Sequence, residues 1–383
     1  MRISVDAHAI GRHLTGNEVY VRNLLHGFAA LDQTSQFIAY LSEDEAAAQL
    51  PPRFLFRKVS ANPYLRLGYD LSRRLRADNP DLLHVQYTAP LGCPVAVVVS
   101  VHDVSFIERP DFLPPARARQ LRITVARTVR RAARILTPSE FSRQSILRAY
   151  RLPDSSVTVV PNAVSSEFRP RSREHAAAWV NRRFGLAAPF ILTVGDLQRR
   201  KNQIGLIRAF EEIVRRHPQL PHRLVIVGKP GWKGEEVQRA GEKSPCAERI
   251  HFTGFVNDDE LQWLYAACHL FVFPSFYEGF GLPILEAMAS GRAVACSKAT
   301  AIPEVADSCA LLFDPGSVKD MTQTIGDLLL DAEMLARFER LGVHRAAAFS
   351  WRNAAQRTLD VYREVAAEKS PVESYKVKSV PAI

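Results

Sequence analysis

The sequence predicts an α/β protein built from two doubly wound parallel-sheet domains that face a central cleft. Strand-like and helix-like segments alternate almost throughout the 383 residues, a pattern typical of parallel sheets covered by helices. A turn-rich passage at residues 161–172 (PNAVSSEFRPRS) interrupts the alternation, which then starts again. We therefore expect one Rossmann-like domain at residues 1–165 and a second at residues 166–351.

Short apolar runs and helically spaced apolar residues place the expected elements of each domain. In the first domain, strands are expected at residues 2–6, 37–41, 82–85, 95–102, 134–138 and 157–160, and helices at 19–31, 65–77, 115–133 and 140–149. In the second, strands are expected at residues 190–194, 223–227, 250–252, 270–273, 293–296 and 310–313, and helices at 203–216, 258–266, 283–290 and 318–330. A helix at about 352–367 is expected to pack back on the first domain, followed by a flexible tail at 368–383.

The composition is that of a soluble globular protein, with 47% hydrophobic and 23% charged residues. No apolar run reaches the ~18–20 residues that a membrane-spanning helix needs, and the N-terminus lacks the apolar core of a signal peptide. The five cysteines are scattered and form no C-x-x-C pair, which argues against disulfides and against a zinc site. We therefore expect a cytoplasmic protein.

Positive charge is concentrated in the first domain, where 21 Lys and Arg face 14 Asp and Glu and so carry +7 of the net +10. Arginines interleave with apolar residues at residues 64–76 and 117–134, a composition that suits contact with an anionic membrane or an acidic acceptor. Solvated helix faces are the alternative. With membrane contact, the protein would work at the inner face of the cytoplasmic membrane. Nucleic acid is not an expected partner, because no binding motif accompanies the charge.

The segment at residues 273–291, FPSFYEGFGLPILEAMASG, predicts a glycine-rich turn that opens a short helix. Pro283 suits the first helical position, because its missing N–H would have no partner there, and Gly291 suits the helix stop. Backbone N–H groups at such a helix start bind anions, and Gly279 and Gly281 would let an anion come close.

Two carboxylates, Glu278 and Glu286, flank this turn. N–H groups for a diphosphate, together with carboxylates for the hydroxyls of a ribose and a sugar, are what a sugar nucleotide needs. The alternative is a capped amphipathic helix with two solvated glutamates.

Basic residues follow the strand expected at residues 190–194. Gly195 opens a turn, and Arg200 and Lys201 precede the next helix, at the sheet edge where open α/β folds bind ligands. Transfer of a sugar from a diphosphate builds negative charge on the leaving phosphate, which cations stabilise. We expect these two residues to bind that diphosphate; a solvated basic turn is the alternative.

Two further positions are expected to face the cleft. His102 and Asp103 end the most apolar strand of the first domain, and His102 would donate to a sugar hydroxyl or to the leaving phosphate. A hydrogen-bonded strand cap is the alternative. Gly16, in Leu14-Thr15-Gly16-Asn17 before the first helix, would bring a helix N-terminus to the same diphosphate.

Other common nucleotide and metal sites are not expected. No G-x-G-x-x-G follows the first strand, and the sequence GEKS at residues 241–244 lacks the upstream glycine of a Walker loop. The loop GKPGW at residues 228–232 suits a position beside a nucleotide base better than a phosphate nest. Since no Asp-x-Asp or histidine cluster is present, we expect neither a catalytic metal nor another cofactor.

Together these motifs resemble those of the retaining glycosyltransferases of family 4, which have the GT-B fold of two Rossmann-like domains. The segments that carry the resemblance span nearly the whole chain: HDVSFIERPDFLP (102–114), LTPSEFS (136–142), VVPNAV (159–164), VGDLQRRKN (194–202), FTGFV (252–256), YEGFGLPILEAMASG (277–291), IPEV (302–305) and ALLFDP (310–315).

The resemblance implies roles for individual residues. Arg200 and Lys201 would bind the donor diphosphate, Glu286 the ribose hydroxyls and Glu278 the transferred sugar, which His102 would also contact. The remaining donor-site positions that it implies or that the motifs indicate are Gly16, Asp103, Gly195, Phe255, Val256, Gly279, Phe280, Gly281 and Leu282. Of these, Phe255 and Val256 would lie near the base, and the N–H groups of residues 280–282 would meet the phosphates or the sugar.

Three departures from the family pattern bear on these roles. Asp196 stands where several members have Thr or Arg, and Arg199 replaces the usual proline and adds a cation. The first loop reads TGNEVY rather than the commoner glycine-isoleucine-glycine-arginine form, which weakens the assignment of Gly16.

The resemblance also implies a reaction. The family transfers sugars with retention of anomeric configuration and without a bound metal, by front-side substitution in which the leaving phosphate accepts the acceptor's proton; a covalent intermediate on Glu278 is the disfavoured alternative. The motifs look most like those of mannosyltransferases of bacterial polysaccharide assembly. We therefore expect transfer of a hexose, mannose from GDP-mannose, to a glycan or lipid-linked acceptor. The alternatives are a non-catalytic nucleotide-sugar binder on the same scaffold and a nucleic-acid or membrane adaptor.

Overall fold

The computed structural model describes residues 1–12, 15–186 and 189–368. Its contacts divide the chain into two compact units. The first unit consists of Met1–Ser100, Thr128–Leu136 and Ala355–Ile383, and the second of Val101–Arg127 and Thr137–Ala354. The domain boundary expected at residues 165 and 166, the cleft and the flexible tail stay predictions, and residues 369–383 lie outside the described residues.

The first sheet has seven strands in the order β3-β2-β1-β4-β5-β6-β7. Its strands are β1 (Arg2–Asp6), β2 (Gln36–Leu41), β3 (Leu55–Lys58), β4 (Leu82–Gln86), β5 (Ala96–Ser100), β6 (Arg134–Thr137) and β7 (Val157–Val159). β1 pairs in parallel with both β2 and β4. The sheet therefore extends from β1 in both directions, to β3 on one side and to β7 on the other. Neighbouring residues of the central strands, such as Leu82 and Leu83, are both buried, as expected for a parallel sheet covered on both faces.

Helices and shorter turns connect these strands. The helices are α1 (Thr15–Leu31), α2 (Pro63–Leu65), α3 (Leu71–Asp78), α4 (Ser105–Glu108), α5 (Pro115–Val129) and α6 (Glu140–Tyr150). The short 3-10 helices are η1 (Glu45–Gln49), η3 (Pro110–Phe112) and η4 (Asp154–Ser156), and η2 (Arg66–Asp70) is a π-helix.

The second sheet has six strands in the order β10-β9-β8-β11-β12-β13. They are β8 (Phe190–Val194), β9 (Arg223–Val227), β10 (Ile250–Gly254), β11 (Leu270–Phe273), β12 (Val294–Ser297) and β13 (Leu311–Phe313). β8 pairs in parallel with β9 and with β11, which places the topological switch point between β8 and β11. Ligands of doubly wound sheets bind beyond the carboxyl ends of the strands at such a point.

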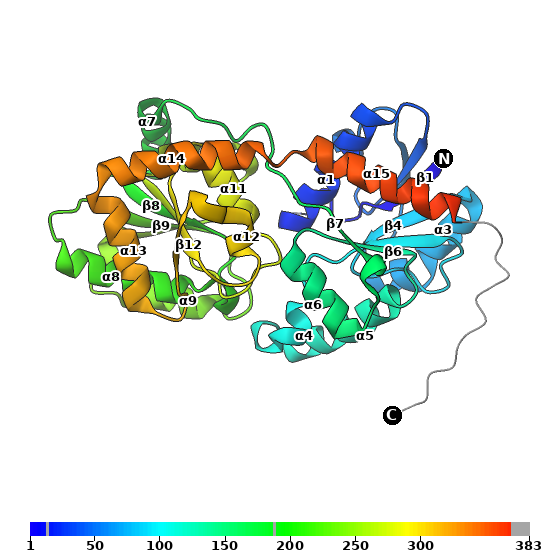
Figure 1. The fold of residues 1–383 in the computed structure, drawn as a ribbon, viewed down its shortest axis with the longest axis horizontal. Helices are drawn as coiled ribbons and strands as arrows, with labels where there is room; N and C mark the ends of the chain where they lie inside the picture. Colours follow the sequence, from blue (N-terminus) through cyan, green and yellow to red (C-terminus); the bar gives the residue numbers. More distant parts are fainter. Residues whose placement is uncertain (13–14, 187–188, 369–383) are drawn as a thin grey trace. The chain divides into compact units, whose positions relative to one another are not determined.

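Helices cover both faces of the second sheet (Figure 1). They are α7 (Arg173–Phe184), α8 (Gln203–Arg216), α9 (Gly234–Glu242), α10 (Asp258–Ala267), α11 (Leu282–Ala289), α12 (Ile302–Ala306), α13 (Val318–Leu330) and α14 (Ala332–Ala347), with the short turns η5 (Arg199–Lys201), η6 (Ala247–Arg249) and η7 (Asp307–Cys309).

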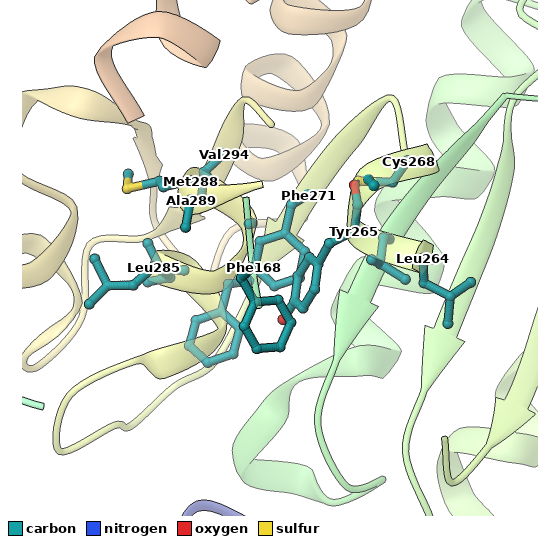
Figure 2. Close-up of a cluster of buried hydrophobic side chains, with 14 of the residues drawn as sticks. Phe168, Leu264, Tyr265, Cys268, Phe271, Leu285, Met288, Ala289 and Val294 are labelled. Atoms are coloured by element: carbon teal, nitrogen blue, oxygen red, sulfur yellow. The ribbon is translucent and has the colours of Figure 1, made fainter. Parts of the chain in front are cut away.

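Successive residues of each central strand alternate between two cores. In β11, Leu270 and Val272 pack with α8, α9 and α13, whereas Phe271 and Phe273 pack with α7, α10 and α11. Figure 2 shows the second core, where the rings of Phe168, Tyr265 and Phe271 gather beside side chains of α11. Helices α10 and α11 therefore pack on the same face of the sheet.

The last described helix, α15 (Trp351–Ala367), belongs from Ala355 to the first unit. Its Tyr362 is fully buried, and the Tyr362 hydroxyl lies 2.5 Å from His84 Nδ1 of β4. Arg134 of β6 forms ion pairs with Glu364 and Glu368 at 3.5 and 3.1 Å. Helix α15 thus packs on the first sheet.

The predicted fold class is confirmed: both sheets are parallel and covered by helices. Several boundaries were wrong. β5 ends at Ser100, so His102 lies in the loop beyond the strand rather than at its end, and α1 begins at Thr15, so Gly16 lies inside the first helical turn instead of before it. Leu14 of that predicted loop lies outside the described residues. The prediction also lacked β3, α7, α9 and α14.

Candidate active site

The candidate site begins where β8 and β9 end, at two glycines whose backbones touch. Gly195 and Gly228 have φ of 148° and 150°, and a Cβ on Gly228 would lie 2.2 Å from the Gly195 carbonyl oxygen. A Cβ on Gly195 would in turn lie 3.1 Å from Cε of Lys201. Glycine is therefore required at both strand ends, because any side chain would separate the two loops or displace the lysine.

The loop that follows β9 packs on the loop that follows β8. The Leu197 N–H donates to the Lys229 carbonyl at 2.9 Å, and the Gly231 N–H donates to the Leu197 carbonyl at 2.9 Å. The glycines of GKPGW thus contact the loop that follows β8, and the expected position of this stretch beside a nucleotide base stays a prediction.

Arg200, Lys201 and Glu278 form a cluster of charges at the switch point. Arg200 Nη1 donates to Glu278 Oε2 at 2.7 Å, and Lys201 Nζ donates to Glu278 Oε1 at 2.7 Å. Arg200 Nη1 also donates to the Tyr277 carbonyl at 2.7 Å, and Lys201 Nζ lies 5.0 Å from the centre of the Phe273 ring. The structure therefore brings together three of the four predicted catalytic residues, and each oxygen of Glu278 has a cation beside it.

Asn202 fixes the backbone that carries the two cations. It adopts a left-handed conformation with φ of 54°, and its Nδ2 donates to the carbonyls of Pro274 and Pro315 at 3.2 and 2.9 Å. The Phe276 N–H donates to the Arg200 carbonyl at 2.9 Å. These bonds join the loops that follow β8, β11 and β13, because one buried amide spans all three.

The cations keep Glu278 ionised. Burial by itself would raise the pKa of this carboxyl, but Arg200 and Lys201 more than offset it and lower the pKa to about 2. Burial lowers the pKa of Lys201, and Glu278 opposes that shift. The cluster is consequently an ion triad in which one buried anion is paired with two half-buried cations.

Helix α11 starts close to its predicted position. It begins at Leu282, one residue before the prediction, so Pro283 takes the second helical position, where its missing N–H also has no intrahelical partner. Gly281 precedes the helix with φ of 120°, and Gly291 follows it with φ of 73°, as expected for a helix stop. The side chain of Phe280 is buried and contacts Phe349, which leaves its backbone at the helix entrance.

Glu286 lies in the second turn of α11, in an environment unlike that of Glu278. The hydroxyl of Tyr265, from α10, donates to Glu286 Oε2 at 2.8 Å. Burial raises the pKa of Glu286 to about 7; the Tyr265 hydrogen bond and Lys201 oppose this shift, and Asp258 adds to it. This carboxyl therefore titrates near neutral pH.

His102 lies against the same turn, within the second unit. A Cβ on Gly279 would lie 2.1 Å from the His102 carbonyl oxygen, so only glycine fits between the two backbones. Ser139 Oγ donates to the Gly279 carbonyl at 2.7 Å, and Ser142 Oγ lies 3.0 Å from the His102 carbonyl. Burial lowers the pKa of His102 to about 4, against the opposing charge of Asp103, so the ring is neutral at pH 7.

Four other residues predicted for the donor site have local surroundings of their own. The Asp103 carboxylate accepts from the Ser105 N–H at 2.8 Å at the start of α4. Val256 is buried in the core, whereas Phe255 is 49% exposed in the loop after β10. Gly16 is exposed in α1 of the first unit. The donor contacts expected of these residues stay predictions.

The sequence reasoning missed three polar residues that support the site. They are Asn202, Tyr265 and Thr300, whose Oγ1 accepts from the Glu278 N–H at 2.9 Å. Tyr265 had a usable signal, because a tyrosine on the apolar face of a helix needs a partner for its hydroxyl. Asn202 follows the two cations directly, but its partners are more than 70 residues away.

Within residues 1–12, 15–186 and 189–368, no group of three His, Cys, Asp or Glu side chains is placed to hold a metal ion. Each helix in this described part of the chain is too short or too polar to cross a membrane.

Solved structures of glycosyltransferases share this fold. WaaG, a glycosyltransferase involved in lipopolysaccharide biosynthesis, superposes with a TM-score of 0.74 over 94% of this chain and 99% of its own, at 16% identity. Anabaena Alr3699/HepE in complex with UDP-glucose superposes with a TM-score of 0.77 over 95% of this chain and 100% of its own, at 18% identity. The two parallel sheets are thus those of the GT-B fold of glycosyltransferases.

Sequence relatives identify the family. Residues 14–168 match the model for Glycosyltransferase Family 4, and residues 188–331 match that for Glycosyl transferases group 1. The chain is 34% identical to the O-antigen chain mannosyltransferase B of Escherichia coli over 267 residues, 70% of each protein. It is 29% identical to the serotype-specific mannosyltransferase WbdA of Escherichia coli over 296 residues, 75% of this chain and 36% of that longer protein. The chain belongs to glycosyltransferase family 4, in which a nucleotide-sugar donor is typical.

Proposed function

We propose that this glycosyltransferase moves mannose from GDP-mannose to a glycan or lipid-linked acceptor in cell-surface polysaccharide synthesis, with retention of configuration. The choice of mannose is supported by the relatives, which include the two Escherichia coli mannosyltransferases and the MMP alpha-(1->4)-mannosyltransferase of Mycolicibacterium hassiacum, 30% identical over 246 residues. The observation that carries the proposal is the Arg200–Glu278–Lys201 triad, with its buried glutamate, beside the start of α11.

The donor diphosphate binds at this triad in the proposed complex. Its oxygens accept from Arg200, Lys201 and the N–H groups at the α11 entrance, where the helix dipole favours negative charge. Glu278 then turns from an internal counterion into an acceptor for hydroxyls of the transferred sugar. Glu286 accepts from the ribose hydroxyls.

The same groups support the proposed chemistry. The two cations stabilise the charge that develops on the leaving phosphate, and neutral His102 donates a hydrogen bond from its ring. Glu278 is ionised at neutral pH, so it has no proton to give, and its ion pairs weaken it as a nucleophile. Front-side substitution, in which the leaving phosphate takes the acceptor's proton, fits these restrictions better than a covalent intermediate on Glu278.

A donor screen tests this proposal. The purified protein is mixed with GDP-mannose, UDP-glucose and ADP-glucose, and thermal shift reports binding while released nucleoside diphosphate reports turnover in the presence of mannosylated acceptors. We expect stabilisation and turnover with GDP-mannose. Binding with neither hydrolysis nor transfer across the acceptor set would favour the alternative, a non-catalytic nucleotide-sugar binder, and preference for another donor would remove the mannose assignment.

We also propose peripheral contact with an anionic membrane through the first unit. Tyr64, Leu65 and Tyr69 are 75%, 61% and 66% exposed, and exposed Arg73 and Arg76 follow on the same helical stretch. Large apolar side chains beside arginines suit an interface with acidic headgroups. This exposure supports membrane contact over a merely solvated helix face.

Vesicle co-sedimentation tests the membrane contact. We expect binding to vesicles of phosphatidylglycerol and phosphatidylcholine in equal parts, little binding to phosphatidylcholine alone, and loss of binding in the double variant Tyr64→Ser with Leu65→Ser. Leu312→Ser, at another exposed leucine, is the control. Equal sedimentation of the double variant and the control would contradict the proposal.

A further inference from the structure

Tyr265 is a fully buried side chain with a polar group aimed at the candidate site. Its ring packs edge-on against Phe168, with centroids 5.7 Å apart, and tilted against Phe271 at 5.3 Å. Figure 2 shows these rings together in the core. The Tyr265 hydroxyl lies at the edge of this apolar cluster and donates to Glu286 Oε2 at 2.8 Å.

The packing makes Tyr265 a fixed donor. A tyrosine has two side-chain torsions. Both are restricted here by the rings and helices around Tyr265, so the position of its hydroxyl oxygen is fixed. A glutamate has three torsions, which cost conformational entropy when a ligand orders them. A hydrogen bond from a fixed hydroxyl orders the carboxylate in advance, and it uses Oε2 while leaving Oε1 to accept from a ligand.

We propose that Tyr265 is a positioning residue of the donor site, which holds Glu286 in the orientation that accepts the ribose hydroxyls of the nucleotide. This inference rests on the proposed function of Glu286. Tyr265 itself would not touch the nucleotide, because its ring lies in the core and its hydroxyl is used by Glu286.

The hydrogen bond also has an electrostatic consequence. Three groups face Glu286: the Tyr265 hydroxyl and Asp258 from α10, and Lys201 from η5. Tyr265 and Lys201 lower the pKa of Glu286, whereas burial and Asp258 raise it. Since ribose hydroxyls donate to the ionised carboxylate, removal of the Tyr265 hydroxyl raises that pKa further and moves the acidic limb of nucleotide binding to higher pH.

The test compares Tyr265→Phe with a matched control, Tyr40→Phe. Tyr40 is also fully buried, and its hydroxyl donates to a carboxylate oxygen, Asp78 Oδ2, at 3.0 Å in the first unit. Calorimetry with GDP as the probe, and UDP and ADP in parallel, measures affinity as a function of pH. We expect Tyr265→Phe to weaken binding about three- to tenfold, the cost of ordering one flexible side chain. We also expect it to shift the acidic limb upward, while Tyr40→Phe changes neither.

A double-variant cycle with Glu286→Gln separates the two levels of the proposal. Tyr265→Phe should have no further effect on affinity in the Glu286→Gln background, because its action passes through the carboxylate. If Glu286→Gln leaves nucleotide affinity unchanged, the proposed function of Glu286 is wrong. If Glu286→Gln weakens binding but Tyr265→Phe behaves like Tyr40→Phe, only the positioning role is wrong.

A second variant covers loss of the fold in Tyr265→Phe, which circular dichroism would reveal. Tyr265→3-fluorotyrosine keeps the ring and the hydroxyl but makes the hydroxyl a stronger donor. We expect its acidic limb to move to lower pH. An unchanged limb would overturn the inference.

Discussion

Glu278 and Glu286 stand eight residues apart in one short segment, yet their surroundings differ in charge. Glu278 lies in the turn before α11 with a cation on each oxygen, and the pKa of its carboxyl is lowered to about 2. Glu286 lies in the helix itself, bound to a tyrosine hydroxyl, and burial raises the pKa of its carboxyl to about 7. Two side chains of one type thus acquire separate properties from their neighbours alone.

The difference teaches what each carboxylate is suited for. An anion held between two cations, with its pKa lowered to about 2, stays ionised at neutral pH, so it suits a permanent structural and electrostatic role. A carboxyl that titrates near pH 7 changes its hydrogen-bonding capacity within the physiological range. Four predictions test whether this division is real.

The largest effect is expected at the triad. Lys201→Ala removes one of two cations from the proposed diphosphate site, so kcat/KM for sugar transfer should fall by about 100- to 1,000-fold, as when a charge-stabilising donor is lost. Steady-state kinetics with the donor found in the screen measure this. Lys319→Ala, at an exposed lysine of α13, is the control and should keep full activity. Comparable activity of the two variants would remove the donor-site assignment.

A smaller loss of affinity is expected at the other glutamate. Glu286→Gln exchanges a carboxylate for a neutral amide of the same shape, so hydrogen bonds from the ribose lose their charge assistance, worth ~1.5–3 kcal/mol. Nucleoside diphosphate binding, measured by calorimetry, should weaken by about 10- to 100-fold. Retained affinity would mean that Glu286 does not meet the nucleotide.

The pH dependence should separate the two residues directly. Because the ionised form of Glu286 binds the ribose, nucleotide affinity should fall as pH drops below about 7, by up to about tenfold per unit. Glu278 should contribute nothing in this range, since its pKa is lowered to about 2. Glu286→Gln should abolish the dependence, and a wild-type affinity that is flat between about pH 5 and 8 would break the comparison.

Stability should change in opposite directions at the two sites. Glu278→Gln leaves two half-buried cations without their anion and should lower the free energy of unfolding by about 2 kcal/mol. The raised pKa of Glu286 means that its stabilising protonation is lost as pH rises through about 7. Glu286→Gln, which does not ionise, should therefore raise the free energy of unfolding by about 1 kcal/mol at alkaline pH. Urea denaturation at pH 8 measures both, and changes of the same sign would contradict the assigned environments.

Much of the fold could be predicted because its central strands are apolar on both faces. β8, β9 and β11 have the predicted bounds, since continuous runs such as FILTV and RLVIV leave few alternatives. β3 was missed because LFRK is short, lies at the edge of its sheet and is only partly buried. The signal for α14 was present in Leu335 and Phe338, but the prediction did not use it.

The sequence indicated individual residues for the candidate site but not how they are arranged. The sequence indicated Arg200, Lys201 and Glu278. It predicted that the two cations bind a diphosphate, but it did not predict that both pair with Glu278. Partners separated by about 77 residues of chain leave no local pattern to read. The hydrogen bond from Asn202 to the Pro315 carbonyl, between residues 113 positions apart, could not be predicted for the same reason.

The pairing of both cations with Glu278 has a consequence for selectivity. Inorganic phosphate and sulfate are abundant competitors for any exposed guanidinium or ammonium group, and here they would have to displace a tethered carboxylate that is present at very high effective concentration. A simple anion brings too few contacts to do so. Occupancy of these cations is thereby reserved for a molecule that engages several loops at once.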